Sequence, residues 1–296
     1  MEIRFTKMEG CGNDYVYIDG ISQSIPAVLK PDLARELSDR HFGVGGDGVI
    51  FINRSGIADF EMEMFNADGT RGEMCGNGIR CVGKYVYDHG YTDREEITVE
   101  SFGSVKTLTL FTAENKVQRV RVNMGPAILE ADDIPAIISQ AETEPVDLPF
   151  GRIIKPVIGV PILVGKENFP VTCVSMGNPH AVVYVDDTEE MDLTKIGPKF
   201  EHHPRFPRRI NTEFVEIIDY NHVRMRVWER GSGETLACGT GCCAVCVAGV
   251  LSGRTADRVL VDVRGGQLEI HWDQEKNVVW MTGPATEVFE GTVRRG

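Results

Sequence analysis

Two short stretches decide the fold, Met74-Cys75-Gly76-Asn77-Gly78 and Ala237-Cys238-Gly239-Thr240-Gly241. They place the pattern Cys-Gly-x-Gly once in each half of the chain, each time just before an apolar run that predicts a helix. Unpaired N–H groups and the helix dipole favour a thiolate at such a position. The glycines allow a ligand to approach the backbone, and a helix N-terminus can hold a carboxylate. A matched pair therefore predicts a site where two thiols face one small substrate.

Other landmarks repeat in the same order as the two cysteine motifs. Gly12-Asn13-Asp14 lies 62 residues before Cys75, and Gly177-Asn178-Pro179 lies 60 residues before Cys238. Further along, Gly-Pro-Ala follows a strand-like segment at 125–127 and again at 283–285. The three pairs of landmarks are offset by 165, 163 and 158 residues. This agreement predicts an internal duplication, in which one fold occurs twice.

The periodicity of the chain predicts mostly strands and few helices. Alternating and β-rich runs recur in both halves. Helices are predicted at residues 31–41, 77–89, 192–202 and 240–251. The last of these is apolar on every face, as expected of a helix enclosed by other structure. We therefore expect an α+β fold of two pseudo-symmetric domains, each with a β-barrel-like sheet wrapped around a central helix.

Composition narrows the class of protein. The chain has 296 residues, of which 42% are hydrophobic and 25% charged, and a formal net charge of −13. This acidity argues against a nucleic-acid binder or a partner of anionic membranes. The N-terminus lacks the apolar core of a signal peptide, and the longest apolar run is half of the about 20 residues that a spanning helix needs. We expect a cytoplasmic protein whose eight cysteines are reduced.

Most of the remaining cysteines are expected to pack as small hydrophobes. Cys243-x-x-Cys246 could form a redox or zinc pair, but zinc would require two more ligands and the seven histidines are scattered. No metal site is therefore predicted, and Cys11, in a Gly-rich turn, stays unassigned. Packing is the expected role of Cys81, Cys173, Cys242, Cys243 and Cys246.

Two further residues lie near the landmarks, and two further runs need an interpretation. His180 follows Asn178-Pro179, and Glu229 lies nine residues before Cys238, so either could accept a proton or tune the pKa of a thiol. The glycine-rich run at 43–48 formally fits a dinucleotide fingerprint, but a helix precedes it and a strand follows it. It is interpreted as a turn. The run at 201–209 is interpreted as a solvated loop.

Together the segments resemble diaminopimelate epimerases, which are cofactor-independent amino-acid racemases. The matching segments extend over nearly the whole chain: Lys7–Asp14, Phe65–Gly69, Cys75–Cys81, Gly177–His180, Asn211, Glu229–Thr235 and Ala237–Gly241. The resemblance implies two domains, 1–123 plus 284–296 and 124–283, with the active site in a cleft between them. It also implies interconversion of LL- and meso-diaminopimelate, no cofactor, and a homodimer.

The resemblance further implies roles for individual residues. Cys75 and Cys238 would be the acid/base pair, and His180 and Glu229 would support the action of the thiols. Substrate binding would fall to Asn13, Asn66, Gly76, Asn77, Asn178, Asn211, Glu229, Arg230, Gly239 and Thr240.

Departures from the family pattern and rival functions are also visible. Family members often carry Leu where Cys11 stands and a substrate-contacting Gln where Gly48 stands. A related racemase with another substrate, such as proline or hydroxyproline, is one alternative. Those relatives typically have Cys-Gly-His-Gly, whereas this chain has Asn77 in third place. The second alternative is a thiol redox or metal-binding protein centred on residues 238–246.

Overall fold

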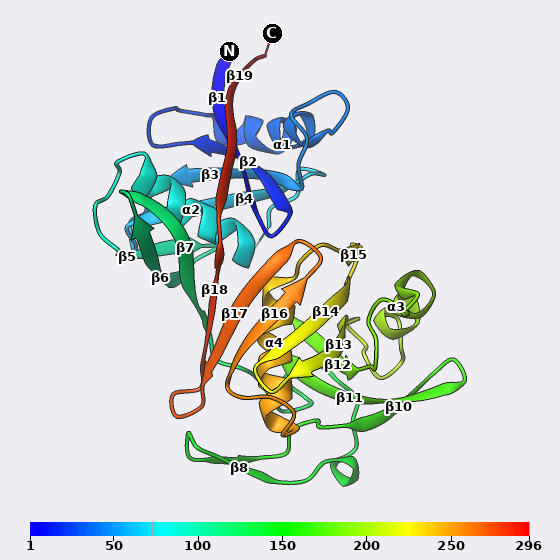
Figure 1. Cartoon of the computed structure of the whole chain (residues 1–296). Coiled ribbons are helices and arrows are strands. Elements are labelled where there is room, and N and C mark those ends of the chain that lie inside the picture. Colours follow the sequence, from blue (N-terminus) through cyan, green and yellow to red (C-terminus); the bar gives the residue numbers. More distant parts are fainter. Residues whose placement is uncertain (73, 296) are drawn as a thin grey trace. The chain divides into compact units, whose positions relative to one another are not determined.

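The computed structural model describes residues 1–72 and 74–295. It divides into two compact units (Figure 1). Unit 1 comprises Met1–Val122 and Thr282–Gly296, and unit 2 comprises Asn123–Met281. The chain therefore leaves unit 1 once, builds unit 2, and returns.

The described residues of unit 1 form two α-helices and a sheet. Its elements are β1 (Glu2–Gly10), β2 (Asn13–Asp19), η1 (Ala27–Leu29), α1 (Lys30–Ser38), β3 (Gly48–Asn53), β4 (Phe60–Asn66), α2 (Gly76–Asp88), β5 (Glu96–Ser101), β6 (Ser104–Ala113), β7 (Lys116–Gly125) and β19 (Thr286–Arg294). The strands pair in the order β19-β1-β2-β3-β4-β5-β6-β7. The pairs β2–β3 and β4–β5 are parallel and the other pairs are antiparallel.

Unit 2 repeats this plan. Its elements are η2 (Gln140–Glu142), β8 (Val146–Leu148), β9 (Arg152–Ile154), β10 (Val160–Val164), β11 (Glu167–Ser175), β12 (Pro179–Tyr184), α3 (Leu193–Glu201), β13 (Asn211–Asp219), β14 (His222–Glu229), β15 (Gly233–Thr235), α4 (Gly239–Leu251), β16 (Arg258–Val263), β17 (Gly266–Asp273) and β18 (Val278–Pro284). The main strands pair in the order β10-β11-β12-β13-β14-β16-β17, with β12–β13 and β14–β16 parallel. Each pair has the same orientation as its counterpart in unit 1, so the predicted duplication is confirmed.

A helix fills the concave side of each sheet. In unit 1, α2 contacts β1, β2, β5, β6 and β19, and in unit 2, α4 contacts β11, β12, β13, β16 and β17. Strands from both ends of a sheet can touch one helix because the sheet curves around it. The side chains of α4 are buried on all sides, as expected of an enclosed helix. The predicted sheet around a central helix is therefore confirmed (Figure 1).

The strand registers show which residues of the two units are equivalent. Tyr15 pairs with Gly48 across β2 and β3, and His180 pairs with Asn211 across β12 and β13. The equivalent position two residues along the second strand holds Ile50 in unit 1 and Glu213 in unit 2. At the ends of β4 and β14, the equivalent residues are Asn66 and Glu229.

One interpretation of the sequence holds only in part. Most residues of the run at 201–209 are exposed or partly exposed, but Glu201, at the end of α3, and Phe206 are buried. Glu201 accepts hydrogen bonds from the Trp228 indole and from the Gly231 N–H group, and Phe206 packs into the core of unit 2. Because these partners are distant in sequence, the polar residues of the run did not indicate that Glu201 and Phe206 are buried.

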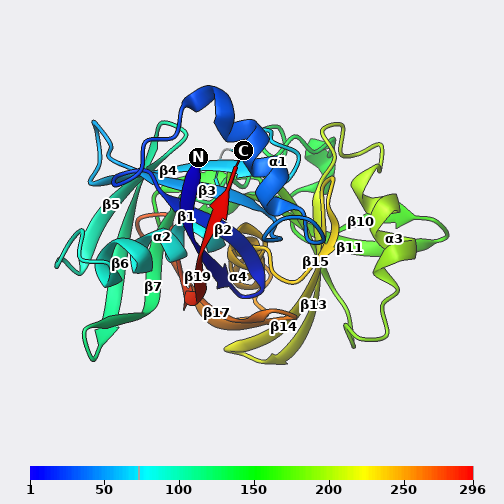
Figure 2. The ribbon, with the colours of Figure 1, turned by 90° about the horizontal axis from the view of Figure 1, so that it is seen from above.

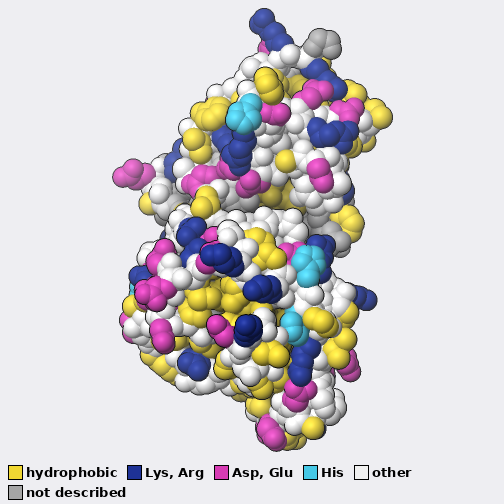
Figure 3. Space-filling model, turned by 90° about the vertical axis from the view of Figure 1, so that its right-hand side faces the viewer, with side chains coloured by type: hydrophobic (Ala, Val, Ile, Leu, Met, Phe, Trp, Pro, Cys, Tyr) yellow, Lys and Arg dark blue, Asp and Glu magenta, His cyan; other side chains and the backbone are white. Residues whose placement is uncertain are grey.

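The termini lie on neighbouring strands. β1 and β19 pair antiparallel with Glu2 opposite Arg294 (Figure 2). On the face in Figure 3, Lys and Arg side chains are interspersed with Asp and Glu. None of the helices in the described residues is long and apolar enough to cross a membrane.

The close packing at Gly48 yields a test of the fold. A Cβ atom at this position would lie 2.1 Å from the carbonyl oxygen of Phe65 and 2.9 Å from the Tyr15 ring. We expect Gly48→Ala to lower the free energy of unfolding by about 1–3 kcal/mol, since backbone has to move. Urea denaturation measures this change. Gly56→Ala is the control, because nothing lies within 4 Å of a Cβ there, and equal stability of the two variants would contradict the prediction.

Candidate active site

In unit 1 the predicted thiol stands at the beginning of α2. Cys75 is the N-cap residue, and its Sγ accepts a hydrogen bond from the Gly78 N–H group at 3.2 Å. The same sulfur contacts Asn13 Oδ1 at 3.1 Å, as a donor in the thiol form. The structure thus brings two predicted residues, Cys75 and Asn13, into contact although they are 62 positions apart.

A tight hairpin sets the position of Asn13. Cys11 and Gly12 connect β1 to β2 with φ angles of 54° and 79°. Positive φ at both residues is typical of a type I′ turn. Asn13 then donates from Nδ2 to Asp47 Oδ2 at 2.6 Å, which orients the amide with its oxygen toward Cys75. Cys11 itself is buried and forms part of the turn between β1 and β2.

Behind Cys75 lies a buried arginine that the sequence reasoning did not single out. Arg80 is fully buried and donates to the Gly76 carbonyl oxygen, to Asn77 Oδ1 and to the Pro284 carbonyl oxygen. Gly76 and Asn77 were predicted to bind substrate. Their backbone N–H groups belong to the first turn of α2, whereas the oxygen of the Asn77 side chain is occupied by Arg80.

Asn66 lies further along the same unit, at the end of β4. It is half-buried, and its Nδ2 donates to Thr70 Oγ1 at 3.0 Å. Its position is equivalent to that of Glu229 in unit 2, so the duplicated fold carries an amide in one unit and a carboxyl group in the other.

In unit 2 the second thiol begins α4. Cys238 is the N-cap residue and is buried, but its side chain makes no capping hydrogen bond. Thr240 Oγ1 lies 3.5 Å from its sulfur, and Asn178 Nδ2 donates to the same hydroxyl at 3.2 Å. Gly239, which lies between Cys238 and Thr240 in the sequence, is the first residue of α4. The structure thus brings together Cys238, Gly239, Thr240 and Asn178.

A buried pair of a histidine and a carboxyl group completes this cluster. His180 Nδ1 lies 2.7 Å from Glu213 Oε1, and both side chains are fully buried. His180 Nε2 lies 3.0 Å from Asn178 Oδ1. Hydrogen bonds therefore run from Glu213 through His180, Asn178 and Thr240 to Cys238.

The three other predicted residues of unit 2 lie around the end of β14. Glu229 accepts a hydrogen bond from Thr235 Oγ1 at 2.5 Å. Asn211 uses both ends of its amide on backbone, donating to the Pro179 carbonyl oxygen and accepting from the Arg230 N–H group. Arg230 is exposed and donates to the Arg208 carbonyl oxygen. Both ends of the Asn211 amide therefore bind backbone groups, at the beginning of β12 and just after the end of β14.

Burial dominates the electrostatics of both thiols. It raises the pKa of Cys75, against the opposing effects of the Gly78 N–H group, the Tyr15 hydroxyl and Arg80. Burial also raises the pKa of Cys238, and there the nearby carboxyl groups of Glu229 and Glu213 raise it further, to well above its ordinary value.

Burial therefore opposes the thiolate that a helix N-terminus favours, and it raises the pKa of both thiols. Loss of water around the sulfur outweighs the helix dipole. The pKa of Glu229 is raised as well, chiefly by burial.

One cluster in this half could bind a metal ion. Ligand atoms of His180, Glu213 and Cys238 all lie within 4.8 Å of one another, and these donor types suit zinc. Cys243 and Cys246 lie buried in α4 and belong to neither of the two groups of potential ligands found among the described residues.

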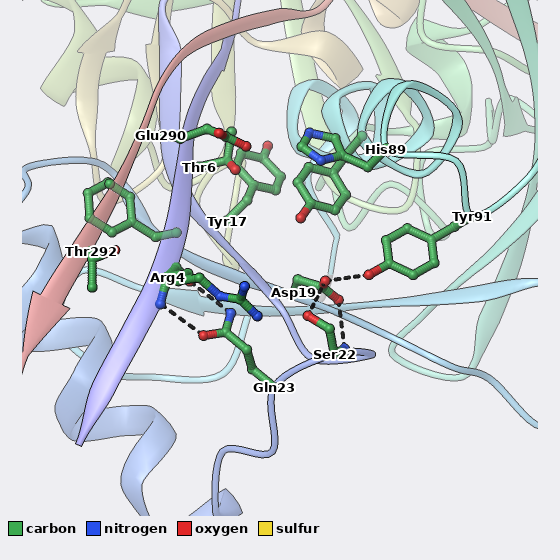
Figure 4. Close-up of a pocket in the computed structure, with 13 residues that line it drawn as sticks. Arg4, Thr6, Tyr17, Asp19, Ser22, Gln23, His89, Tyr91, Glu290 and Thr292 are labelled. Carbon is green, nitrogen blue, oxygen red and sulfur yellow. Dashed lines mark hydrogen bonds between the residues drawn. The ribbon is translucent and has the colours of Figure 1, made fainter.

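A cavity of about 610 Å³ opens elsewhere in unit 1. Tyr17, Asp19, Tyr85, His89 and Glu290 are among the residues that line it (Figure 4). It contains none of the predicted site residues and no thiol, so it is separate from the cysteine chemistry.

Sequence reasoning missed Tyr15, Asp47, Arg80 and Glu213. Arg80 lies within the helix that follows Cys75, where a charged residue on an apolar stretch is a visible signal. Glu213 lies two residues after Asn211 in a strand, and no local pattern marks it. Its role becomes apparent only when β12 and β13 are paired.

Comparisons with known proteins agree with this geometry. A family model described as diaminopimelate epimerase matches residues 5–130 and 172–288. Diaminopimelate epimerase from Agathobacter rectalis is 52% identical over 291 residues, which cover 98% of this chain and 99% of that protein. The enzyme from Leptospira biflexa is 52% identical over 99% of each chain. A Bacillus anthracis protein of the PhzF phenazine-biosynthesis family shares the fold, with a TM-score of 0.69, 15% identity and full coverage of both chains.

The hydroxyl of Tyr15 offers a test of the first half-site. It lowers the pKa of Cys75, so Tyr15→Phe is expected to raise that pKa and leave less thiolate at a given pH. Alkylation of Cys75 by iodoacetamide at pH 8, followed by peptide mass spectrometry, should become several-fold slower. Tyr184→Phe removes a hydroxyl from unit 2 and should leave the rate unchanged. Faster alkylation in Tyr15→Phe would refute the assignment.

Proposed function

Because the chain belongs to the diaminopimelate epimerase family, we propose that it interconverts LL- and meso-diaminopimelate by proton transfer between two thiols. It is an isomerase of the cofactor-independent kind. Such a reaction supplies a precursor of lysine and of peptidoglycan.

The observation that carries this proposal is the pair of equivalent thiols. Cys75 and Cys238 are each the N-cap residue of the helix enclosed by their sheet. Each cluster also contains an asparagine, Asn13 at the beginning of β2 and Asn178 directly before β12. Inversion of a carbon centre requires removal of a proton on one face and delivery on the other. Two thiols that face one substrate meet this requirement, whereas a single base tends to return the proton to the same face.

The proposed step is balanced in protons. One cysteine, as thiolate, takes the α-proton and becomes a thiol. The other, as thiol, gives its proton to the opposite face of the same carbon and becomes a thiolate. The roles of Cys75 and Cys238 exchange when the substrate has the opposite configuration.

The carbanion needs stabilisation, because a free thiol with a pKa of about 8.5 is a weak base toward an α-C–H bond. The first-turn N–H groups after Gly76 and Gly239 are suited to bind the carboxylate where charge develops. Preorganised donors of this kind contribute about 3–4 kcal/mol each in comparable sites. The cationic α-ammonium group of the substrate would also offset the burial that raises the thiol pKa values.

The other predicted residues have different roles in this proposal, from direct contact with the substrate to positioning of other residues. Asn13 and Asn178 lie beside the thiols and would contact substrate directly. Asn66, Asn77, Thr240, Glu229 and Arg230 would complete the binding surfaces of their units. Asn211 would act by positioning Arg230 and the end of β14. His180 and Glu229 would support proton movement at Cys238.

We also propose that the enzyme acts as a homodimer in the cytoplasm, with the two units as domains that close on the substrate. Dimerisation is consistent with the exposure of the neighbouring side chains Val288 and Phe289 on β19, at 54% and 47%. Contiguous exposed apolar groups of this kind often mark contact surfaces.

The function is tested by isotope exchange. The reduced enzyme, without added cofactor, is incubated with LL-diaminopimelate in deuterated water. We expect deuterium at the α-carbon together with meso product, because the delivered proton comes from a thiol in exchange with solvent. A parallel panel with proline and hydroxyproline should show no exchange. Exchange with proline alone would replace this function with that of a related racemase.

Each thiol is tested by removal. Cys75→Ala and Cys238→Ala should each lower kcat for epimerisation by at least about 100-fold, since a missing proton carrier cannot be replaced from the opposite face. Cys246→Ala, which removes a buried thiol of α4 outside the site, is the control and should keep most of the activity. An active Cys238→Ala variant would exclude the two-thiol mechanism.

The dimer is tested by sedimentation equilibrium at micromolar concentration. The expected mass is twice the 32.8 kDa of one chain. A mass of one chain throughout the concentration range would overturn this part of the proposal.

A further inference from the structure

Three side chains of different donor type meet beside the beginning of α4. Ligand atoms of Cys238, His180 and Glu213 all lie within 4.8 Å of one another, and the three residues are buried. A thiol, an imidazole and a carboxyl group are the kinds of protein ligand that zinc takes, and three of them can hold the ion with one coordination position left open. The donor set therefore suits a single zinc ion.

Glu213 supplies an oxygen atom for which the fold provides no partner. Its side chain is fully buried, and Oε1 lies 2.7 Å from His180 Nδ1. Oε2 has no hydrogen-bond partner in the described part of the chain. The carboxyl group reaches the first turn of α4, since a Cβ atom at Gly241 would lie 2.6 Å from Oε1. A buried oxygen without a partner costs free energy, and a cation bound beside it removes that cost.

The histidine is already oriented as a metal ligand. Asn178 donates from Nδ2 to Thr240 Oγ1, so its amide oxygen is the atom that faces His180 Nε2 at 3.0 Å. An amide oxygen only accepts hydrogen bonds, so the proton of this contact is on Nε2, and Nδ1 is the nitrogen turned toward Glu213. Metal-bound histidines typically donate their other ring N–H group to an oxygen acceptor in this way. The outer contact that orients such a ligand is therefore present.

The described part of unit 1 has no such donor set beside its thiol. The positions that hold His180 and Glu213 in unit 2 hold Tyr15 and Ile50 in unit 1. Cys75 belongs to neither group of potential metal ligands in the described residues. Because isoleucine fills the position of Glu213 in the other unit, packing alone does not require a carboxyl group there. The difference restricts metal affinity to one of the two thiols.

We propose that Cys238, His180 and Glu213 form an inhibitory site for zinc, in which the bound ion removes one thiol from the reaction. A Zn–S bond replaces the S–H bond of Cys238, and Zn–N and Zn–O bonds replace the hydrogen bond between His180 and Glu213. The two displaced protons go to solvent, so the doubly charged ion leaves the net charge of the buried cluster unchanged.

Binding requires a small movement of one side chain. Zn–N and Zn–O bonds of about 2.0–2.2 Å in a tetrahedral arrangement hold the nitrogen and the oxygen about 3.4 Å apart. The two atoms are 2.7 Å apart in the structure. A rotation of the Glu213 carboxyl group therefore accompanies binding. The inhibition rests on the proposed function, because it follows from the loss of Cys238 as a proton carrier, whereas the binding of the ion does not.

Cobalt binding to the reduced, full-length enzyme tests the site. Co²⁺ takes the same ligands as zinc and gives a sulfur-to-cobalt charge-transfer band in the near ultraviolet when a thiolate binds it. The band is expected in the wild type and in Cys75→Ala, and it should be lost in Cys238→Ala. Glu213→Ile, which introduces the side chain of unit 1, should weaken cobalt binding at least about tenfold, since loss of even an outer partner of a metal ligand costs about 10–100-fold.

His89→Ala is the matched control. His89 forms the second group of potential ligands with Glu287 and Glu290, and this group contains no sulfur. The variant should leave the cobalt band unchanged. Absence of the band in the wild type would overturn the proposal, and so would a band that persists in Cys238→Ala.

Alkylation of the wild type decides the question even where a variant fails to fold. Zinc at about ten times its dissociation constant, measured by displacement of cobalt, should slow the labelling of Cys238 by iodoacetamide about tenfold. The labelling of Cys75 should stay unchanged. Equal protection of both cysteines, or of neither, would contradict a site confined to unit 2.

An epimerisation assay separates this inference from the function on which it rests. Saturating zinc should abolish most of the wild-type activity with diaminopimelate, and a chelator should restore it. An enzyme that binds cobalt through Cys238 but does not epimerise diaminopimelate would refute the proposed function alone. An enzyme that epimerises diaminopimelate but shows no cobalt band would refute the metal site alone.

Discussion

The close approach of a helix N-terminus to a strand is the constraint on which both half-sites depend. At Gly78 and Gly241 the helix lies so near to β3 and β13 that a single methyl group would collide with a side chain. Only glycine permits this distance. The preceding cysteine is thereby brought to the ends of strands that carry asparagine, histidine and carboxyl groups. Replacement of the glycine would move the thiol away from its partners in each unit.

Much of the fold could be predicted because its determinants are local or repeated. The Cys-Gly-x-Gly motifs and the constant spacing to Asn13 and Asn178 indicated two copies of one fold, and the pairings of both sheets confirm it. The helices begin and end within two or three residues of their predicted limits.

What could not be predicted depends on contacts between distant strands. No sequence pattern identifies Glu213 as a site residue, because its partner, His180, lies on the neighbouring strand. Phe206 was assigned to a solvated loop because its burial depends on a core to which distant strands contribute. The rise in the pKa of both thiols was not expected from the sequence for a related reason. A helix N-terminus is visible in sequence, but the extent of burial around a sulfur atom is not.

The pairing of β1 with β19 has a consequence for biosynthesis. β1 is made before all the other described strands and β19 after them, and they are adjacent in the finished sheet. During translation one edge of β1 remains unpaired until β19 has left the ribosome, and by then all the strands of unit 2 from β8 to β17 are already made. Unpaired strand edges are prone to non-native association. Unit 2 can therefore complete its sheet first, and the terminal strand closes unit 1 as the final event of folding.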